Sequence, residues 1–517
     1  MGGRVFDYVI LVVYALLMVA IAIVTRNRSK SVNDFLLAGK KGLNGWMSAF
    51  SYGTTYFSAV IFIGYAGNFG RQYGLASVWI GVANAIVGGL FAWLVLAKRT
   101  KNMTTALGTK TMPEFFEKRY ESKKLKLVSA IVVFVFLLPY SASVYNGLSS
   151  LFGMVFGIDG WIVMICLAFL TALYLFFGGY FATAVSDFIQ GIIMLVGVAV
   201  MVFCFMNHSF VDWDLSELTS NPNLNWFTFE STNTGIYGNT VSLLSLVFLT
   251  SFGVWALPQT VHKYYAIRDK KSISQGTIVS TVFALIIGFS AYFVGSLSNL
   301  FPSEIIPDTM AKDNIIPTML VQVIPAGLMG IIAVLILSAS MSTLASVSLA
   351  SASVVAVDIY KGSVNKDASD KKVNITMKAF CLIFVFASVA IAILNQAFGI
   401  TAIAYMMGIS WGTLAGCFMG PFVLGMIWKR TTKAACWASI ISSLTLTVGL
   451  ILFFGYHKNG FDCSLGTAIQ SGVGVSPMIG VICMAFSLII TVVVSLVTKA
   501  PSQATINEAF NKEKAIV

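Results

Sequence analysis

Hydroxyl side chains recur along residues 338–360, a helix-length segment in an otherwise apolar part of the chain. Ser338, Ser342 and Ser346 follow one another at intervals of four residues, and Thr343 comes directly after the second of them. In a helix this spacing places the hydroxyl oxygens on one face, about 6 Å apart. Hard cations prefer oxygen ligands, and uncharged oxygens suit a monovalent ion that must bind and then leave. The spacing therefore predicts a sodium site; the alternative is close packing by small residues between membrane helices.

A second candidate is Asp187, which lies about one helical turn inside one end of an apolar run at 185–206. An ionisable group at membrane depth is costly unless it meets a partner, an ion or a substrate. No Lys or Arg lies near Asp187 in the sequence. We therefore expect it to lie on a cation pathway; the alternative is an interfacial carboxylate that reaches water.

Membrane helices must position these side chains, because the composition is not that of a soluble protein. Of the 517 residues, 57% are hydrophobic and only 10% are charged, and the mean hydropathy is +0.85. The runs long enough to cross a hydrocarbon core of about 30 Å are 6–24, 46–66, 77–97, 127–153, 160–178, 185–206, 240–260, 275–299, 324–357, 374–395, 401–427, 434–455 and 475–497. An all-α polytopic membrane protein with about thirteen transmembrane helices is predicted.

The loops between these runs differ in charge, which predicts the orientation of the chain. The loops 98–126 and 262–271, the second of which includes Lys263, are rich in Lys and Arg, whereas 207–239 holds four acidic residues and no Lys or Arg. Since basic loops stay in the cytoplasm, we expect a protein of the cell membrane with its N-terminus outside and its C-terminus in the cytoplasm. Orientation also explains the net charge of +12, so no nucleic-acid binding is expected.

Two of the predicted spans carry interruptions typical of transporters. The segments 51–58 and 251–259 each combine glycine with hydroxyl and aromatic residues, and Pro258 removes a backbone donor. Broken helices of this kind expose carbonyls and helix ends at the membrane midplane. They lie five spans apart, as an inverted repeat of five helices plus five requires. We expect a transport core at 46–427, with repeats at 46–206 and 240–427. The remaining predicted segments are a peripheral first helix with its loop (1–45), two further peripheral helices (428–498) and a cytoplasmic tail (499–517).

Other classes of function are disfavoured by the same residues. His208, His262 and His457 all fall at loop boundaries and the seven cysteines have no paired spacing, so an enzyme with a metal site is not expected. A selectivity-filter motif is missing from the sequence, which disfavours a channel. A sensor would need an output domain, for which the segment after Lys499 has no room.

The chain resembles the sodium/solute symporter family over nearly its whole length. The resemblance rests on FLLAGK at 35–40, GG followed by SDFIQ within 178–190, SMSTLAS at 340–346 running into 358–360, and GPFVLGMIWKRTTKAA at 420–435. It implies a thirteen-helix transporter of the inverted-repeat fold that couples solute uptake to sodium entry.

The resemblance also implies site residues. The implied sodium ligands are the carbonyls of Thr54, Phe57 and Ala339 and the hydroxyls of Ser342 and Thr343. Asp187 and Ser346 would line the sodium exit route or a second site. Position 345 is Ala where family members with a second sodium tend to offer a hydroxyl, which favours one sodium per cycle.

The solute is less well specified by the sequence. The candidate contacts are Thr55, Tyr56, Ser58, Tyr140, Ser143, Trp255, Pro258 and Gln259; Tyr140 and Trp255 have ordinary packing as an alternative. The segment 140–143 is similar to the proline-transporting branch of the family, which favours an amino acid such as proline. Sialic acid, pantothenate and monocarboxylates stay open as alternatives. The partners expected are this solute, sodium as the only metal, and the lipid bilayer, without an obligate protein partner. No Lys or Arg is expected inside the spans, so a solute carboxylate would have to meet sodium, hydroxyls or a helix N-terminus.

Overall fold

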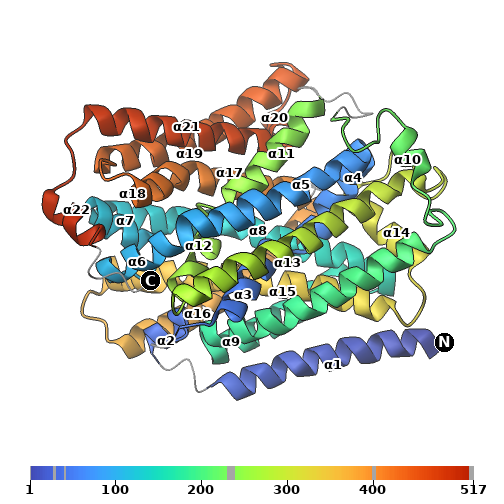
Figure 1. Ribbon diagram of the computed structural model, residues 1–517, viewed down its shortest axis with the longest axis horizontal. Helices are drawn as coiled ribbons and strands as arrows, with labels where there is room; N and C mark the ends of the chain where they lie inside the picture. Colours follow the sequence, from blue (N-terminus) through green and yellow to red (C-terminus); the bar gives the residue numbers. More distant parts are fainter. Residues whose placement is uncertain (1, 27–30, 40–41, 230–238, 399–402, 512–517) are drawn as a thin grey trace.

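The computed structural model describes residues 2–26, 31–39, 42–229, 239–398 and 403–511, and within these ranges the chain is a bundle of helices without a named β-strand (Figure 1). The first half contains α1 (Gly2–Thr25), α2 (Val32–Leu37), α3 (Gly45–Tyr56), α4 (Gly67–Tyr73), α5 (Val78–Ala83), α6 (Lys98–Leu107), α7 (Met112–Tyr120), α8 (Lys123–Phe156), α9 (Gly160–Met206) and α10 (Ser216–Ser220). The second half contains α11 (Asn239–Gly253), α12 (Pro258–Tyr265), α13 (Lys270–Ser296), α14 (Ile315–Val323), α15 (Met329–Ser353), α16 (Asp370–Phe398), α17 (Ile403–Phe418), α18 (Gly425–Ile427), α19 (Lys433–Asn459), α20 (Leu465–Val473), α21 (Ser476–Val497) and α22 (Gln503–Ala509).

Shorter segments of wider or tighter helical winding join these elements. The π-helical segments are η2 (Val60–Ala66), η4 (Asn84–Phe91), η5 (Trp93–Ala97), η8 (Val354–Val364) and η9 (Met419–Leu424). The 3-10 segments are η3 (Gly74–Ser77), η6 (Leu297–Leu300) and η7 (Lys312–Asn314). In Figure 1, α1 lies along one side of the bundle and α19 and α21 lie along the opposite side.

The predicted number of spans is confirmed once two long helical runs are divided. Eleven helices of the described chain are long and apolar enough to cross a membrane, among them runs at 45–107 and 160–206. A straight helix of 47 residues would be about 70 Å long, more than twice the hydrocarbon thickness. The run at 160–206 is interrupted at Gly179 (φ 59°, ψ −156°), and the run at 45–107 at Gly74 (φ 53°, ψ −136°). Each run therefore supplies two spans, which gives thirteen.

Both predicted helix breaks are present. The first lies between α3 and η2, where Phe57 is extended (φ −105°, ψ 114°). The second separates α11 from α12, and Pro258 is the first residue of α12, a position that needs no backbone donor. The protein is thus an all-α membrane protein with two broken helices, as predicted.

The hydroxyl-rich helix α15 occupies the centre of the bundle. It packs against α1, α3, α8, α9 and α16, and almost every residue along it is buried. A helix that is buried all round normally presents large apolar residues on every face. In α15, Ser and Ala instead let the neighbouring backbones approach closely. Packing by small residues, the alternative interpretation of this segment, therefore holds for much of the helix.

Backbone contacts at glycine hold α13 against the helices that follow the first break. A Cβ added at Gly81 would lie within 3.0 Å of the Gly288 backbone, and one added at Gly70 would lie within 3.0 Å of the Gly295 backbone. Real Cβ atoms essentially never approach other atoms so closely. Either substitution must therefore push two helices apart.

We expect Gly81→Ala to destabilise the protein by about 1–3 kcal/mol, because overpacking at a closed contact forces the backbones to shift. The measurement is the Tm of purified protein in detergent. Gly89→Ala is the matched control, since its Cβ would make only ordinary contact, 3.5 Å from the Thr281 Cα. Alanine favours helix over glycine by about 1 kcal/mol, so the control should be neutral or stabilising. Equal Tm values for the two variants would contradict the close contact.

Candidate functional site

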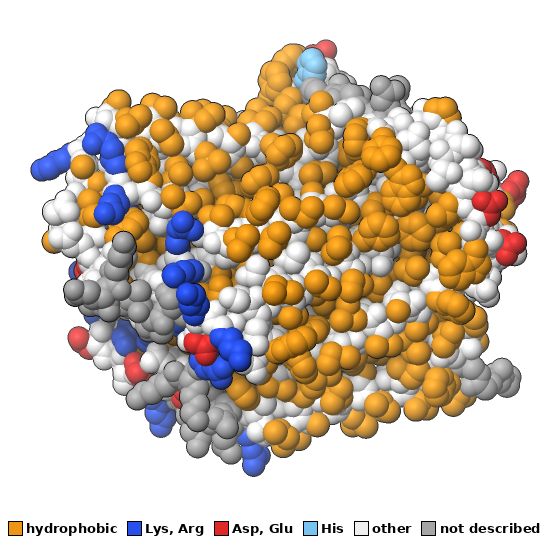
Figure 2. Space-filling model, in the orientation of Figure 1, with side chains coloured by type: hydrophobic (Ala, Val, Ile, Leu, Met, Phe, Trp, Pro, Cys, Tyr) orange, Lys and Arg blue, Asp and Glu red, His pale blue; other side chains and the backbone are white. Residues whose placement is uncertain are grey.

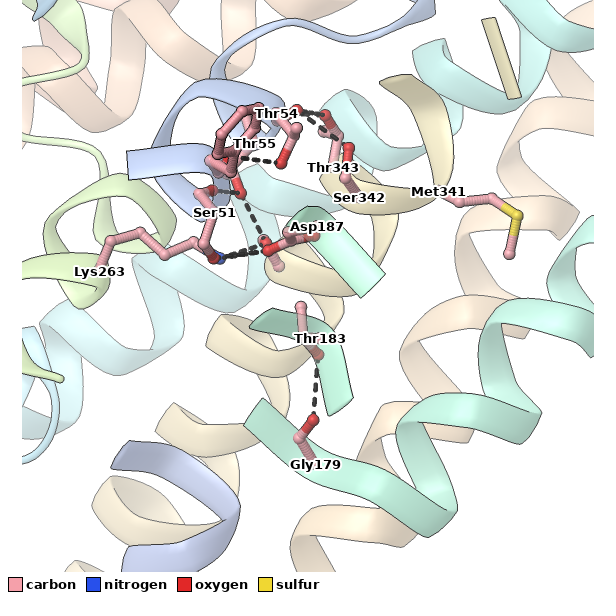
Figure 3. Close-up of polar contacts among 12 residues, drawn as sticks. Ser51, Thr54, Thr55, Gly179, Thr183, Asp187, Lys263, Met341, Ser342 and Thr343 are labelled. Carbon is pink, nitrogen blue, oxygen red and sulfur yellow. Dashed lines mark hydrogen bonds and ion pairs between the residues drawn. The ribbon is translucent and has the colours of Figure 1, made fainter. Parts of the chain in front are cut away.

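The C-terminal end of α3 meets the middle of α15 at a cluster of oxygen atoms (Figure 3). Ser342 Oγ lies 3.0 Å from the Thr54 carbonyl oxygen and Thr343 Oγ1 lies 3.4 Å from it. Both hydroxyls also lie 3.1 Å from the Ala339 carbonyl oxygen. The last carbonyls of a helix have no partner within the helix and carry the negative end of its dipole. The break after α3 thus presents acceptor oxygens to the hydroxyls of α15.

Four of the five implied sodium ligands therefore lie together. Their oxygens belong to two carbonyls and two hydroxyls without formal charge, which is the donor set expected for a monovalent cation. The fifth, Phe57, is buried where α3 ends. Its ring stacks on Tyr56 with centroids 4.7 Å apart, and no hydrogen bond joins its carbonyl to the other four residues.

Asp187 of α9 lies in a second polar cluster with Lys263 of α12 (Figure 3). Lys263 Nζ is 3.4 Å from Asp187 Oδ2, 2.9 Å from Ser51 Oγ and 2.7 Å from Ser346 Oγ. Ser51 also donates to Asp187 Oδ2 at 2.5 Å. Four separate helices contribute to this cluster, namely α3, α9, α12 and α15.

The expectation that no Lys or Arg would lie inside the spans is wrong for Lys263. Its side chain is 1% exposed, and the ammonium neutralises Asp187, which looked unpaired in the sequence. The sequence placed Lys263 in a basic loop because the apolar run ends near residue 260. Helix α12, which follows the break, continues to Tyr265, and residues 258–265 are all buried. One signal was available, since Gln259 and Lys263 are spaced to share a helix face.

Several candidate solute contacts converge on Trp411 of α17. The Tyr140 ring lies edge-on to Trp411 with centroids 5.6 Å apart, and Tyr56 stacks on Trp411 at 6.2 Å. The Tyr140 hydroxyl lies close to Ser58 and Thr343, although it makes no hydrogen bond of good geometry. Aromatic rings and the unpaired Tyr140 hydroxyl therefore lie near Thr343, one of the sodium-ligand candidates.

Other predicted contacts are occupied by the protein itself. Tyr56 donates its hydroxyl to the Thr250 carbonyl at 2.7 Å, and Ser143 donates to the Tyr140 carbonyl at 2.7 Å. The indole N–H of Trp255 donates to the Val87 carbonyl at 3.0 Å, which turns this side chain toward η4. Trp255 makes no hydrogen bond or ring contact with Tyr140 or Trp411.

Three polar side chains near the breaks differ in whether they have hydrogen-bond partners. Ser58 Oγ accepts from the Val60 amide at 3.2 Å, and Thr55 Oγ1 is 2.8 Å from Ser346 Oγ. Gln259, which follows Pro258 in α12, is 1% exposed and neither polar atom of its amide has a partner. An unpaired buried amide is costly, so Gln259 is a strong candidate for a ligand contact.

Sequence reasoning missed Trp411. Its ring is 1% exposed and its indole N–H has no hydrogen-bond partner. The signal was the polar step Ser410-Trp411-Gly412 within an otherwise apolar run. Periodicity alone could not show that this tryptophan meets Tyr56 and Tyr140, which lie on other helices.

The site is closed to solvent on both sides. Among the predicted site residues only Trp255 is partly exposed, and all the others are buried. Burial excludes water and strengthens the interaction of an ion with carbonyl and hydroxyl dipoles. Entry of a ligand into this site therefore requires the surrounding helices to move.

Comparisons with known proteins agree with this fold. Residues 35–442 match the profile of the sodium:solute symporter family. A sodium/proline symporter of Staphylococcus aureus is 26% identical over 529 residues, covering 99% of this chain and 96% of that protein. A sodium/pantothenate symporter of Haemophilus influenzae is 25% identical over 448 residues, covering 84% and 89%. The solved structure of a Na+-coupled sialic acid symporter aligns with a TM-score of 0.76 at 18% identity, covering 96% of this chain and 98% of that one. The chain belongs to the sodium:solute symporter family.

Proposed function

We propose that this protein imports a small organic solute, an amino acid such as proline, together with sodium by alternating access. The observation that carries the proposal is the convergence of the Ser342 and Thr343 hydroxyls on the Thr54 carbonyl at the end of a broken helix. A cation bound to these oxygens would tie α3 to α15. The family assignment supports sodium as that cation.

In this proposal sodium entry drives solute accumulation. One positive charge moving down a potential of 100 mV releases about 2.3 kcal/mol, and a tenfold sodium gradient adds about 1.4 kcal/mol. Together these terms sustain a few hundredfold accumulation of a neutral solute. Sodium that bridges α3 and α15 would order Tyr140, whose hydroxyl lies near Thr343 and Ser58. Loosening of that bridge would release the ion and the solute on the cytoplasmic side of the membrane.

The chemistry around Trp411 supports a small zwitterion. Aromatic rings of Tyr56 and Tyr140 flank the indole, and these can contact an apolar ring or chain. The hydroxyl of Tyr140 supplies a polar contact beside the indole, and the unpaired amide of Gln259 on α12 is a further candidate. A solute carboxylate would meet the bound sodium. The similarity to a sodium/proline symporter favours proline.

An organic anion is the second candidate, and the buried Lys263 favours it. A cation at this depth can attract a carboxylate, and a relative is named as a sodium/pantothenate symporter. Against this candidate, Lys263 already has Asp187 as its counter-ion. Uptake experiments separate the two.

The deciding experiment is uptake of labelled proline, pantothenate, sialic acid and short monocarboxylates into proteoliposomes, with and without an inward sodium gradient. Proline accumulating only with the gradient would support the amino-acid proposal. Accumulation of an anion alone would replace it with the second candidate. Sodium flux without any solute would instead indicate a channel.

The orientation of the chain and its division into segments form part of the proposal. Lys and Arg side chains on the visible face of Figure 2 gather at the end of the molecule near α22, with some Asp and Glu among them, whereas a group of Asp and Glu without Lys or Arg lies at the opposite end near α10. This separation supports a cell-membrane protein with its N-terminus outside and its C-terminus in the cytoplasm. We further propose a transport core at 46–427, with repeats 46–206 and 240–427, flanked by 1–45, 428–498 and the tail 499–517. Residues 512–517 of that tail lie outside the described part.

Tyr140→Phe is expected to raise the KM for the solute about tenfold, because a buried hydroxyl without a partner in the protein is free to bind solute. The measurement is the concentration dependence of uptake in proteoliposomes. Tyr145→Phe is the matched control, since the Tyr145 hydroxyl is also buried and unpaired on α8. The Tm should be unchanged or slightly higher in both variants. An equal KM in Tyr140→Phe and the parent would exclude Tyr140 as a solute contact.

A further inference from the structure

The ammonium of Lys263 sits in a shell of oxygen atoms that resembles an ion site. Its three neighbours are Ser346 Oγ at 2.7 Å, Ser51 Oγ at 2.9 Å and Asp187 Oδ2 at 3.4 Å. The side chains of Lys263 and Asp187 are 1% and 0% exposed. Lys263 Nζ also lies over the Tyr180 ring, 5.1 Å from its centroid. Two hydroxyls, a carboxylate and an aromatic face are all groups that attract a cation.

The direction of each hydrogen bond in this cluster follows from its neighbours. Ser51 donates its hydroxyl proton to Asp187, so Ser51 Oγ can only accept from Lys263. Thr55 donates its proton to the Ser51 carbonyl at 2.7 Å, so in the contact between Thr55 and Ser346 the proton must come from Ser346. Ser346 Oγ therefore also accepts from Lys263.

All three N–H groups of Lys263 are consequently donors. A neutral amine has only two N–H groups and one lone pair, whereas an ammonium has three donors and no acceptor. Two serine oxygens and the Asp187 carboxylate accept these three bonds. The arrangement is that of a protonated lysine held in place of a free cation.

This shell lies next to the proposed sodium site. Thr55 contacts Ser346 through its hydroxyl, and its carbonyl oxygen is 3.3 Å from Thr343 Oγ1. Ser342 and Ser346 are one helical turn apart on the same face of α15, a separation of about 6 Å. The two sites thus share α3 and α15, so a charge in one site changes the electrostatic potential at the other.

We propose that Lys263 is a tethered cation that fills a second cation site formed by Ser51, Asp187 and Ser346, so that this protein binds a single sodium ion. The inference rests on the proposed sodium coupling. Because Lys263 belongs to α12, its ammonium also ties the second broken helix to α3, α9 and α15 without a mobile ion. The charge that a second sodium would bring and release stays attached to the protein.

The test counts sodium ions bound to purified protein in detergent, with radiolabelled sodium and with choline chloride to hold ionic strength constant. One sodium per protein is expected for the wild type. Lys263→Met should bind two, because Asp187 and the two serines then need a replacement cation. The double variant Lys263→Met/Asp187→Asn should bind one again, since the carboxylate that attracts the second ion is gone. In uptake, the Hill coefficient for sodium should rise from about 1 to about 2 in Lys263→Met alone.

Lys101→Met is the matched control. Lys101 also contacts α12, donating to the Tyr265 carbonyl at 2.8 Å, yet it has no link to Asp187, so this variant should bind one sodium. Two sodium ions bound to the wild type, or one bound to a folded Lys263→Met, would overturn the inference and leave sodium coupling intact. No sodium bound to the wild type would overturn the proposed coupling itself. If Lys263→Met is too unstable for the count, its Tm should rise more in sodium than that of the wild type, with no such rise in choline, and an equal rise in both proteins would contradict the proposal.

Discussion

Replacing Ser342 or Thr343 with alanine is expected to raise the sodium concentration for half-maximal uptake at least tenfold, and replacing both is expected to abolish sodium-dependent uptake. Each hydroxyl lies within 3.4 Å of the Thr54 carbonyl and 3.1 Å of the Ala339 carbonyl. Removing one of so few oxygen ligands leaves the buried ion without a ligand that water cannot replace there. A loss of about 1.4 kcal/mol of binding free energy already lowers the affinity tenfold. Initial uptake rates measured over a range of sodium concentrations provide the readout.

Ser348→Ala is the control for this prediction. Ser348 also lies on α15 and is 1% exposed, and its hydroxyl has no partner. Its backbone carbonyl is contacted by Cys381 of α16, and no hydrogen bond joins its hydroxyl to α3. Its replacement should leave the sodium dependence unchanged. If both Ser342→Ala and Thr343→Ala kept the parental sodium affinity, the proposed ion site would be wrong.

Arg119→Ala is expected to lower the free energy of unfolding by about 3 kcal/mol or more, which makes it the most destabilising change outside the site. The Arg119 side chain is 0% exposed and donates to the carbonyls of Gly425, Trp428 and Lys429 at 3.1–3.2 Å. Gly425 begins α18 and the other two residues follow the end of that helix; the contact with Gly425 is buried and the other two are partly buried. A buried acceptor left without a donor costs about 1–3 kcal/mol. The Tm in detergent should fall by several degrees.

Arg119→Lys should recover only part of this loss, because an ammonium cannot span three carbonyls as the planar guanidinium does. Arg430→Ala is the control on the same segment, since Arg430 is exposed and makes a single bond to the Leu496 carbonyl at 2.9 Å. That variant should change the stability by less than about 1 kcal/mol. A Tm for Arg119→Ala equal to that of Arg430→Ala would contradict the structural role of Arg119.

Local patterns were sufficient to predict the membrane spans and the two breaks. Hydropathy marks the spans because the bilayer demands a fixed length of apolar helix. The breaks at Phe57 and before Pro258 were visible because glycine, hydroxyl and proline residues interrupt apolar runs there. The hydroxyl ladder of α15 was likewise local, since residues four apart must share a face.

Contacts between distant segments could not be predicted in the same way. Lys263 and Asp187 are 76 residues apart, and nothing in either neighbourhood specifies the other. Trp411 meets Tyr56 and Tyr140 only because three helices pack together. Trp255 was expected in the solute site from its position beside a break, yet its indole bonds to Val87. Such pairings depend on the tertiary arrangement of the helices. No short sequence pattern specifies that arrangement.

The glycine contacts along α13 bear on which parts of the protein can move during transport. Where Gly70 meets Gly295 and Gly81 meets Gly288, backbone rests on backbone, and no side chain is available to change rotamer and accommodate sliding. We therefore expect α13, α4 and α5 to travel as one rigid block. In the proposed transport cycle we expect the hinges to lie at the non-helical residues 57–58 and 254–257. We expect sliding at the surfaces where side chains separate this block from its neighbours.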